Sequence, residues 1–314
     1  MEINETLRIG TRGSDLALQQ THWVAGRLRE NFPGLKVEIT VIKTKGDIMS
    51  DVSLAQIGGK GVFVKEIEEA LLRDQIDIAV HSMKDVPAEL PDGLEIGVIP
   101  AREDPRDVLI SKDNRKLEEL PQGARIGTGS LRRGFQIKNL LPDIEIVALR
   151  GNLNTRIRKI VTDNLDGVIV AAAGLSRMGW LPQVSQFIPV EMMLPAVGQG
   201  AIGIELRSDD KDTKDTVSFL NHPSTWLEVS AERSFLKWLG GGCRLPIAAY
   251  GKRDGDSLGL MGLVGDVDGR VVIRDVVRGP VEEAEALGKE LAEKISSRGG
   301  RDILEEVYKT CFKP

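Results

Sequence analysis

Two short segments of the sequence repeat the same order of residue types. R-I-G-T-R-G-S-D-L begins at Arg8, and R-I-G-T-G-S-L begins at Arg125. Each segment predicts a strand, a glycine–threonine turn and a serine that caps the helix after it. We interpret the pair as two lobes of the same build that face each other across a cleft. A common strand–helix turn that occurs twice by chance is the alternative. In both interpretations the free N–H groups at the helix starts favour an anion.

Strand-like and helix-like segments alternate around both copies of this repeat. Such alternation predicts α/β lobes, each with a largely parallel sheet. In the first lobe we expect strands at 7–11, 36–44 and 76–82, and helices at 16–32 and 62–73. In the second lobe we expect strands at 125–127, 144–149 and 166–173, and helices at 135–141 and 154–162.

The segments between and after the lobes predict the rest of the organisation. P-A-R-E-D-P-R-D, from Pro100 to Asp107, has two prolines and five charged residues, which indicates a hinge. Residues 194–207 are expected to cross back to the first lobe. A helix at 225–239, a three-stranded antiparallel meander and helices at 282–297 and 302–309 predict a small α+β domain. We therefore expect domains at 1–99 with 198–217, at 104–194 and at 221–314.

Composition excludes several classes of protein. The 314 residues are 41% hydrophobic with a net charge of −5, and no apolar run of ~18 residues predicts a membrane span. The N-terminus does not resemble a signal peptide. Only Cys243 and Cys311 are cysteines, which favours a reducing cytoplasm over a disulfide framework. The scattered cysteines and histidines match no metal-site spacing, and we expect no metal. The negative charge and 4% aromatic content disfavour nucleic-acid binding.

Arginines concentrate in the second lobe. Seven of them lie between positions 125 and 177, where there are only four acidic residues. A guanidinium can hold a carboxylate or phosphate through two hydrogen bonds, so the group predicts a local anion site. A solvated basic helix face is the alternative. The seven are Arg125, Arg132, Arg133, Arg150, Arg156, Arg158 and Arg177.

The segment H-S-M-K-D-V-P, from His81 to Pro87, follows the buried strand I-D-I-A-V. α/β sheets usually bind ligands at the carboxyl ends of their strands, where Lys84 and Asp85 are expected to lie. A partly buried Asp85 can act as an acid or base, or stabilise a developing cation. The alternative is that Asp85 caps a turn before Pro87.

Cys243 follows three glycines and precedes Arg244 in L-G-G-G-C-R. A nucleophilic cysteine needs a nearby cation or helix N-terminus to lower its pKa. An inert cysteine is the alternative, but the glycines remove side-chain bulk and permit unusual backbone angles beside the sulfur.

Motifs along nearly the whole chain resemble those of the porphobilinogen deaminase (hydroxymethylbilane synthase) family. They occur in the family's order and include R-I-G-T-R-G-S-D-L-A-L, T-K-G-D, G-G-K-G-V-F-V-K-E-I-E, D-I-A-V-H-S-M-K-D-V-P, G-T-G-S-L-R-R, L-R-G-N-L-N-T-R, A-A-A-G-L-S-R-M-G, L-P-A-V-G-Q-G-A-I-G-I-E and A-E-R-S-F-L-K-W-L-G-G-G-C-R-L-P. The resemblance implies two lobes like those of periplasmic binding proteins, a third domain that carries the cofactor, and a monomer.

The resemblance also implies a reaction. A dipyrromethane cofactor would be bound covalently through a thioether to Cys243. Four porphobilinogen molecules would be condensed onto it with release of four ammonia, and hydrolysis would release hydroxymethylbilane. Asp85 matches the catalytic aspartate, which would stabilise positive charge on pyrrole nitrogen.

By the same motif match, binding residues can be assigned. The cofactor carboxylates would be held by Ser82, Lys84, Thr128, Ser130, Arg132, Arg133 and Arg156. The substrate would be held by Arg12, Ser14, Gln19, Lys60, Arg150, Arg177 and Gln199. One departure is Gly129, where the family usually has serine.

Two other functions stay open on the residues themselves. A non-catalytic two-lobed binding protein for a polycarboxylated small molecule would suit the lobes and arginines, but it leaves the G-G-G-C loop unexplained. A cysteine hydrolase would require Cys243 to pair with His81 or His222.

Overall fold

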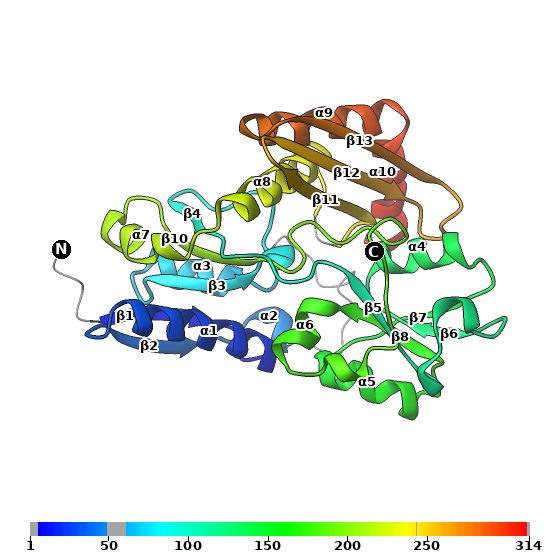
Figure 1. Ribbon diagram of the computed structural model, residues 1–314, viewed down its shortest axis with the longest axis horizontal. Coiled ribbons are helices and arrows are strands. Elements are labelled where there is room, and N and C mark those ends of the chain that lie inside the picture. Colours follow the sequence, from blue (N-terminus) through cyan, green and yellow to red (C-terminus); the bar gives the residue numbers. More distant parts are fainter. Residues whose placement is uncertain (1–5, 49–60, 243, 313–314) are drawn as a thin grey trace.

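The computed structural model describes residues 6–48, 61–242 and 244–312, which form two α/β lobes and a C-terminal α+β layer (Figure 1). The first lobe has a five-stranded sheet in the order β2-β1-β3-β10-β4. Its strands are β1 (Thr6–Thr11), β2 (Lys36–Val41), β3 (Ile78–Ser82), β4 (Leu94–Val98) and β10 (Ile202–Arg207). Its helices are α1 (Asp15–Asn31), α2 (Lys45–Ile48), α3 (Lys65–Leu72) and α7 (Lys211–Val217).

The second lobe repeats this arrangement with the strand order β7-β6-β8-β5-β9. Its strands are β5 (Asp107–Ser111), β6 (Arg125–Gly127), β7 (Glu145–Val147), β8 (Gly167–Ala171) and β9 (Gln186–Phe187). Its helices are α4 (Leu131–Leu140), α5 (Leu153–Thr162) and α6 (Ala172–Arg177). Strand for strand, β6, β7 and β8 correspond to β1, β2 and β3, so the expectation of two lobes of the same build is confirmed.

Both sheets are mixed, but four of the five strands in each run in the same direction, so the expectation of largely parallel sheets is confirmed apart from one reversed strand per sheet. In the first sheet β1 is parallel to β2 and β3, whereas β10 is antiparallel to β3 and β4. In the second sheet β5 is antiparallel to β8 and β9. The reversed strands, β5 and β10, are the first strands that the chain forms after it crosses from one lobe to the other. Each of them starts at the rim where its neighbour ends, because Ile202 pairs with Ser82 and Asp107 with Ala171.

The two crossing segments lie against each other. The predicted hinge connects β4 to β5, and the predicted return segment leads into β10. Glu103 donates its backbone N–H to the carbonyl of Gly200 at 3.2 Å. Gly200 has φ of +89°, and a Cβ there would lie 2.4 Å from the Glu103 carbonyl oxygen. The close approach of the two segments therefore requires glycine at this position.

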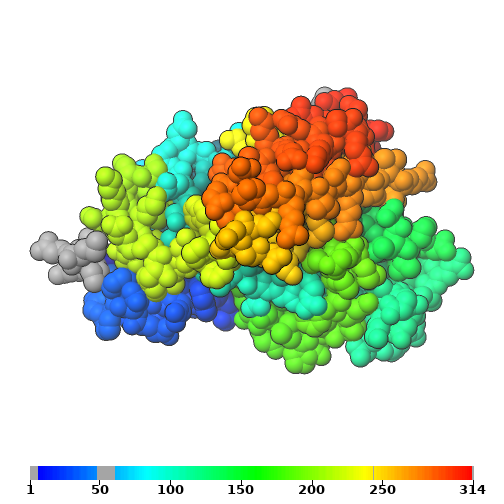
Figure 2. Space-filling model, turned by 45° about the horizontal axis from the view of Figure 1, so that its top comes forward, coloured from blue at the N-terminus to red at the C-terminus, as the bar shows by residue number. Residues whose placement is uncertain are grey.

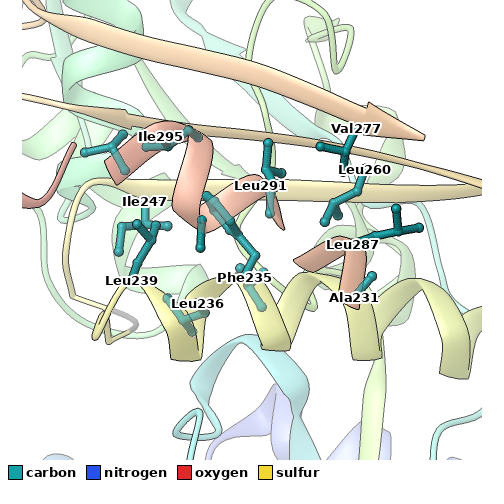
Figure 3. Packing of buried hydrophobic residues seen from close by; sticks show 14 of the residues in the cluster. Ala231, Phe235, Leu236, Leu239, Ile247, Leu260, Val277, Leu287, Leu291 and Ile295 are labelled. Atoms are coloured by element: carbon teal, nitrogen blue, oxygen red, sulfur yellow. The ribbon is translucent and has the colours of Figure 1, made fainter. Parts of the chain in front are cut away.

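The C-terminal layer is the predicted antiparallel meander covered by helices. Its sheet has the order β11-β12-β13, with β11 (Ile247–Asp254), β12 (Ser257–Gly265) and β13 (Val272–Pro280). Its helices are α8 (Pro223–Trp238), α9 (Ala284–Ser297) and α10 (Gly300–Cys311). Phe235 and Leu291, both 0% exposed, pack between α8, α9 and the sheet (Figure 3). Figure 2 shows this layer, in orange and red, lying across both lobes.

Glu232 on α8 connects the C-terminal layer to both crossing segments. Its carboxylate is 0% exposed and forms an ion pair with Arg102 of the first crossing at 2.6 Å. It also accepts the N–H of Gly198, in the second crossing, at 2.7 Å and that of Gly251, in β11, at 2.9 Å. One buried side chain thus holds four segments together, and its helix leads directly to the glycine loop before Cys243.

In the part of the chain that the structure describes, every helix is too short or too polar to cross a membrane.

We predict that Glu232→Gln lowers the free energy of unfolding by about 3–5 kcal/mol, because it leaves the guanidinium of Arg102 buried without its counter-ion. Urea unfolding of the full chain would measure the change. Asp254→Asn is the control, since it breaks the exposed pair with Arg278 and should cost at most about 1 kcal/mol. Equal effects of the two substitutions would contradict the role given to Glu232.

Candidate active site

Helix starts of the two lobes carry the serine caps that the sequence predicts. Ser14 accepts the N–H of Ala17 at 3.3 Å and caps α1. Ser130 accepts the N–H of Arg133 at 3.4 Å and caps α4. Each cap leaves other N–H groups of the first turn without an intrahelical partner, and these favour an anion.

The carboxyl end of β3 places Ser82, Lys84 and Asp85 at the rim of the first lobe. β3 is buried, and a short 3₁₀ turn of Met83–Asp85 follows it. Met83 is 1% exposed and anchors this turn in the core, so the side chains on either side of it are held at the rim. Asp85 lies in the wall of a pocket, together with Arg12, Ser14, Gln20, Phe63 and Ser82.

Two buried arginines of the second lobe enclose one carboxylate. Arg132 and Arg133 lie on the first turn of α4 and are 3% and 4% exposed. Both form ion pairs with Asp107, at 2.7 and 2.8 Å. Burial raises the pKa of Asp107, but the two guanidinium groups outweigh it and hold the pKa at about 2. Asp107 is therefore ionised at neutral pH.

Site residues of the two lobes interact electrostatically across the rim. Burial, with the charge of Arg133, lowers the pKa of Lys84 to about 8, and Asp85 partly opposes this. Burial, again with Arg133, lowers the pKa of Arg156 to about 10, and Asp85 opposes this too. The structure thus brings residues of the first lobe together with arginines of the second, as the sequence predicts. The described residues of this group are five cations and two carboxylates: Lys84, Arg132, Arg133, Arg150 and Arg156, with Asp85 and Asp107.

Arg12 and Arg177 lie at the edges of this cationic group. The guanidinium of Arg12 lies 4.2 Å from the ring centre of Phe63 and donates to Asp47 at 3.2 Å. Arg177, at the end of α6, donates to the carbonyl of Gly200 at 2.7 Å, and burial lowers its pKa. Because α6 packs against α1, Arg177 lies where the two lobes meet.

The glutamines differ in what they contact. Gln199 is 1% exposed and donates its amide to Asp107 at 3.0 Å, so it lies behind the arginines. Gln19 is exposed on α1, whereas its neighbour Gln20 is buried and donates to Ser82 at 2.9 Å. Of the two neighbours, Gln20 is the one that the structure brings to the pocket wall.

Comparison with known proteins identifies the family. Residues 7–215 match the family model "Porphobilinogen deaminase, dipyromethane cofactor binding domain", and residues 226–297 match "Porphobilinogen deaminase, C-terminal domain". The chain is 58% identical to a porphobilinogen deaminase of Syntrophus aciditrophicus (strain SB), over 96% of this chain and 98% of that protein. It is 57% identical to a porphobilinogen deaminase of Geobacter metallireducens, over 96% and 95%. The chain belongs to the porphobilinogen deaminase family.

Solved structures of binding proteins are less similar to this chain than the members of the family are. The methionine-binding protein MetQ is 15% identical and covers 71% of this chain and 92% of its own, with a TM-score of 0.43.

Gly129, the departure from the usual porphobilinogen deaminase motif, has a packing reason. A Cβ at this position would lie 2.3 Å from the carbonyl oxygen of Leu149. The turn between β6 and α4 therefore packs directly against the backbone that leads to Arg150. Thr128, 4% exposed, accepts the N–H of Ser130 at 3.2 Å and fixes the same turn.

Two predicted porphobilinogen deaminase residues, Lys60 and Cys243, lie outside the described residues. The histidines of the hydrolase hypothesis both have partners of their own. Nε2 of His81 lies 2.9 Å from Glu205, and Nδ1 of His222 caps α8 by accepting the N–H of Thr225 at 3.3 Å.

Three residues of the site were missed in the sequence. Asp107 was included only in the charged hinge, although it begins the apolar run D-V-L-I. Gln20 stands next to the residue that was chosen. Phe63 occurs within the quoted motif G-G-K-G-V-F-V-K-E-I-E, but its contact with Arg12 depends on the tertiary fold.

We predict that Asp85→Asn lowers the pKa of Lys84 below about 8, because Asp85 is one of the charges that favour the ammonium form. NMR titration of ¹³C-methylated lysines in the cofactor-free chain would measure it. Asp92→Asn removes an exposed carboxylate of the same segment and should leave Lys84 unchanged. An ordinary lysine pKa for Lys84 in the unsubstituted chain would contradict its burial among cations.

Proposed function

We propose that the chain condenses four porphobilinogen molecules, with release of four ammonia and then of hydroxymethylbilane. Family membership supports this activity, and one structural observation supports its assignment to particular residues. At the rim between the lobes, five cations face two carboxylates. Each pyrrole ring of such a substrate carries an acetate and a propionate, and several guanidiniums are needed to bind these groups and offset their repulsion.

The same donor set fits a dipyrromethane. Its carboxylates would bind to cations and hydroxyl groups of the rim, and the proposed holders are Ser82, Lys84, Thr128, Ser130, Arg132, Arg133 and Arg156. Cys243 is the proposed point of attachment through a thioether. When bound, the group supplies the free pyrrole α-carbon onto which the porphobilinogen units are added.

Asp85 is the proposed catalytic residue. Its carboxylate lies in the pocket wall with Arg12 and Ser14 and interacts with Lys84 and Arg156. A carboxylate fixed among cations can stabilise positive charge that develops on a pyrrole nitrogen. The proposed substrate-binding residues are Arg12, Ser14, Gln19, Lys60, Arg150, Arg177 and Gln199. The burial of Gln199 supports an action through Asp107 and Arg133.

The organisation of the molecule is proposed in the same way. Domain 1 would comprise residues 1–99 and 198–217, domain 2 residues 104–194, and domain 3 residues 221–314. The separate sheets and the paired crossing segments support these boundaries. We expect a monomer in the cytoplasm whose small-molecule partner is porphobilinogen.

We predict that the intact mass of the denatured chain exceeds that of the polypeptide by one dipyrromethane, and that Cys243→Ala removes this excess. Cys311→Ala is the matched control and should retain it. Addition of porphobilinogen to the unsubstituted chain should give further steps of one pyrrole unit. Excess mass that persists in Cys243→Ala would refute the attachment site. A chain that stays at its bare mass after incubation with porphobilinogen would refute the activity.

We predict that Asp85→Asn retains the dipyrromethane mass but lowers kcat about 100-fold or more, since the fixed charge is lost while the volume is kept. Release of ammonia from porphobilinogen would measure kcat. Asp92→Asn should keep the activity of the unsubstituted chain. A kcat within a few-fold of normal in Asp85→Asn would remove Asp85 from its proposed role.

A further inference from the structure

A group of buried acidic side chains lies behind the pocket, beside His81. Glu68 on α3 is 7% exposed, and Glu205 on β10 is 0% exposed. Each has one buried carboxylate oxygen, Oε1, with no hydrogen-bond partner. A buried carboxylate oxygen without a partner is costly, and two of them in one group require an explanation.

The fold brings these carboxylates to the pocket through His81. β10 is antiparallel to β3, so Glu205 lies two positions along β10 from Gly203, the residue that pairs with His81. Nε2 of His81 lies 2.9 Å from Oε2 of Glu205. His81 also lies in the wall of the pocket that contains Asp85. The histidine therefore connects the buried acids to the site.

The surrounding charges favour a proton on Glu68. Burial, followed by the negative charge of Glu205, raises the pKa of Glu68 to about 7, although His81 opposes this and Glu66 adds to it. Across the group, the charge of Arg233 on α8 interacts with Glu205. The other strands beside α3 contribute charges that are already paired. Arg8 on β1 pairs with Asp77, and Glu95 on β4 pairs with Lys214 of α7.

We propose that Glu68 carries a proton while Glu205 stays ionised, and that His81, held by Glu205, receives the proton that each condensation releases in the pocket. A proton on Glu68 removes the charge from a buried carboxyl group that has an oxygen without a partner. It also leaves Glu205 able to accept the Nε2–H of His81, which makes Nδ1 the basic nitrogen of the ring. His81 is then the residue that meets the reacting groups, while Glu205 and Glu68 are positioning residues.

The proton balance of the reaction, which rests on the proposed function, requires such an acceptor. Each condensation breaks the carbon–nitrogen bond of an aminomethyl group, and the electron pair of this bond leaves with ammonia. A carbon–carbon bond forms at a pyrrole α-carbon, and the hydrogen on that carbon leaves as a proton. Nδ1 of His81 takes it, the carboxylate of Glu205 stabilises the resulting imidazolium, and the departing ammonia finally removes the proton as ammonium.

Infrared spectroscopy of the full chain tests the proton on Glu68 without reference to activity. The unsubstituted chain should show the carbonyl band of a buried protonated carboxyl group at pH 6, which disappears above pH 8. Glu68→Gln should remove this band and Glu205→Gln should shift it. Glu69→Gln changes a partly exposed residue of the same helix and should leave the band unchanged. A band that is absent at pH 6, or that neither Glu68→Gln nor Glu205→Gln alters, would overturn the proposal.

Thermal unfolding adds a second readout that also shows whether the variants fold. Because the pKa of Glu68 is raised in the folded chain, its contribution to stability is complete at low pH and is lost as the pH rises through about 7. Glu68→Gln mimics the protonated form, so its Tm should fall less between pH 5 and pH 8. An unchanged fall in Tm would count against the raised pKa.

Kinetics then separate this inference from the proposed function. Glu205→Gln should lower kcat on the order of tenfold or more with little change in KM, and Glu68→Gln should change the pH dependence of kcat near 7. If the unsubstituted chain incorporates no porphobilinogen, the proposed function fails. If it turns over normally and both variants have its kcat and pH profile, only the proton-transfer role fails.

Discussion

The carboxylate of Asp107 makes the rest of the site possible. It lies between Arg132 and Arg133 and lets two guanidinium groups be buried side by side, which their mutual repulsion would otherwise prevent. It also accepts the amide of Gln199, so the segment that enters the second lobe is tied to the one that leaves it. Glu232 repeats this principle one layer away, where it joins both segments to the helix before the cysteine loop. Buried carboxylates therefore join the structural units, alongside apolar contacts such as that of Phe135 on α4 with Leu263 on β12.

Local sequence patterns predict most of the helices and strands, but they do not predict which strands lie side by side in a sheet. The caps at Ser14 and Ser130 and the C-terminal meander depend on residues close together in the chain, and the structure contains them. The directions of β5 and β10 depend on where the chain crosses between the lobes, which no local pattern records. Asp107 was missed for the same reason, because its importance comes from its place opposite Ala171 at the start of an entering strand.

The number of arginines predicted an anion site, but it did not distinguish their environments. Arg132 and Arg133 are buried and paired with a carboxylate of the protein, so they provide a fixed positive field at the rim. Arg12 lies in the pocket wall and is held by Asp47, whose pKa is lowered because the hydrogen bonds and charge of Arg12 outweigh the effect of burial. A carboxylate that enters the pocket would compete with Asp47 for Arg12. The same residue type is thus buried against a fixed partner in one place and lies in the pocket wall in another.

The buried carboxyl groups also differ in their surroundings, and the difference changes their pKa. Asp107 is held at a pKa of about 2 by two guanidinium groups, so it stays ionised throughout the physiological range. Glu68 is also buried, but no arginine offsets the burial; burial and the charge of Glu205 raise its pKa to about 7. Asp85 lies in the pocket wall and interacts with Lys84 and Arg156 of the rim. Some reactions need both a fixed negative charge and a group that exchanges protons near neutral pH. Carboxyl groups can fill both roles, provided that the fold gives each one different neighbours.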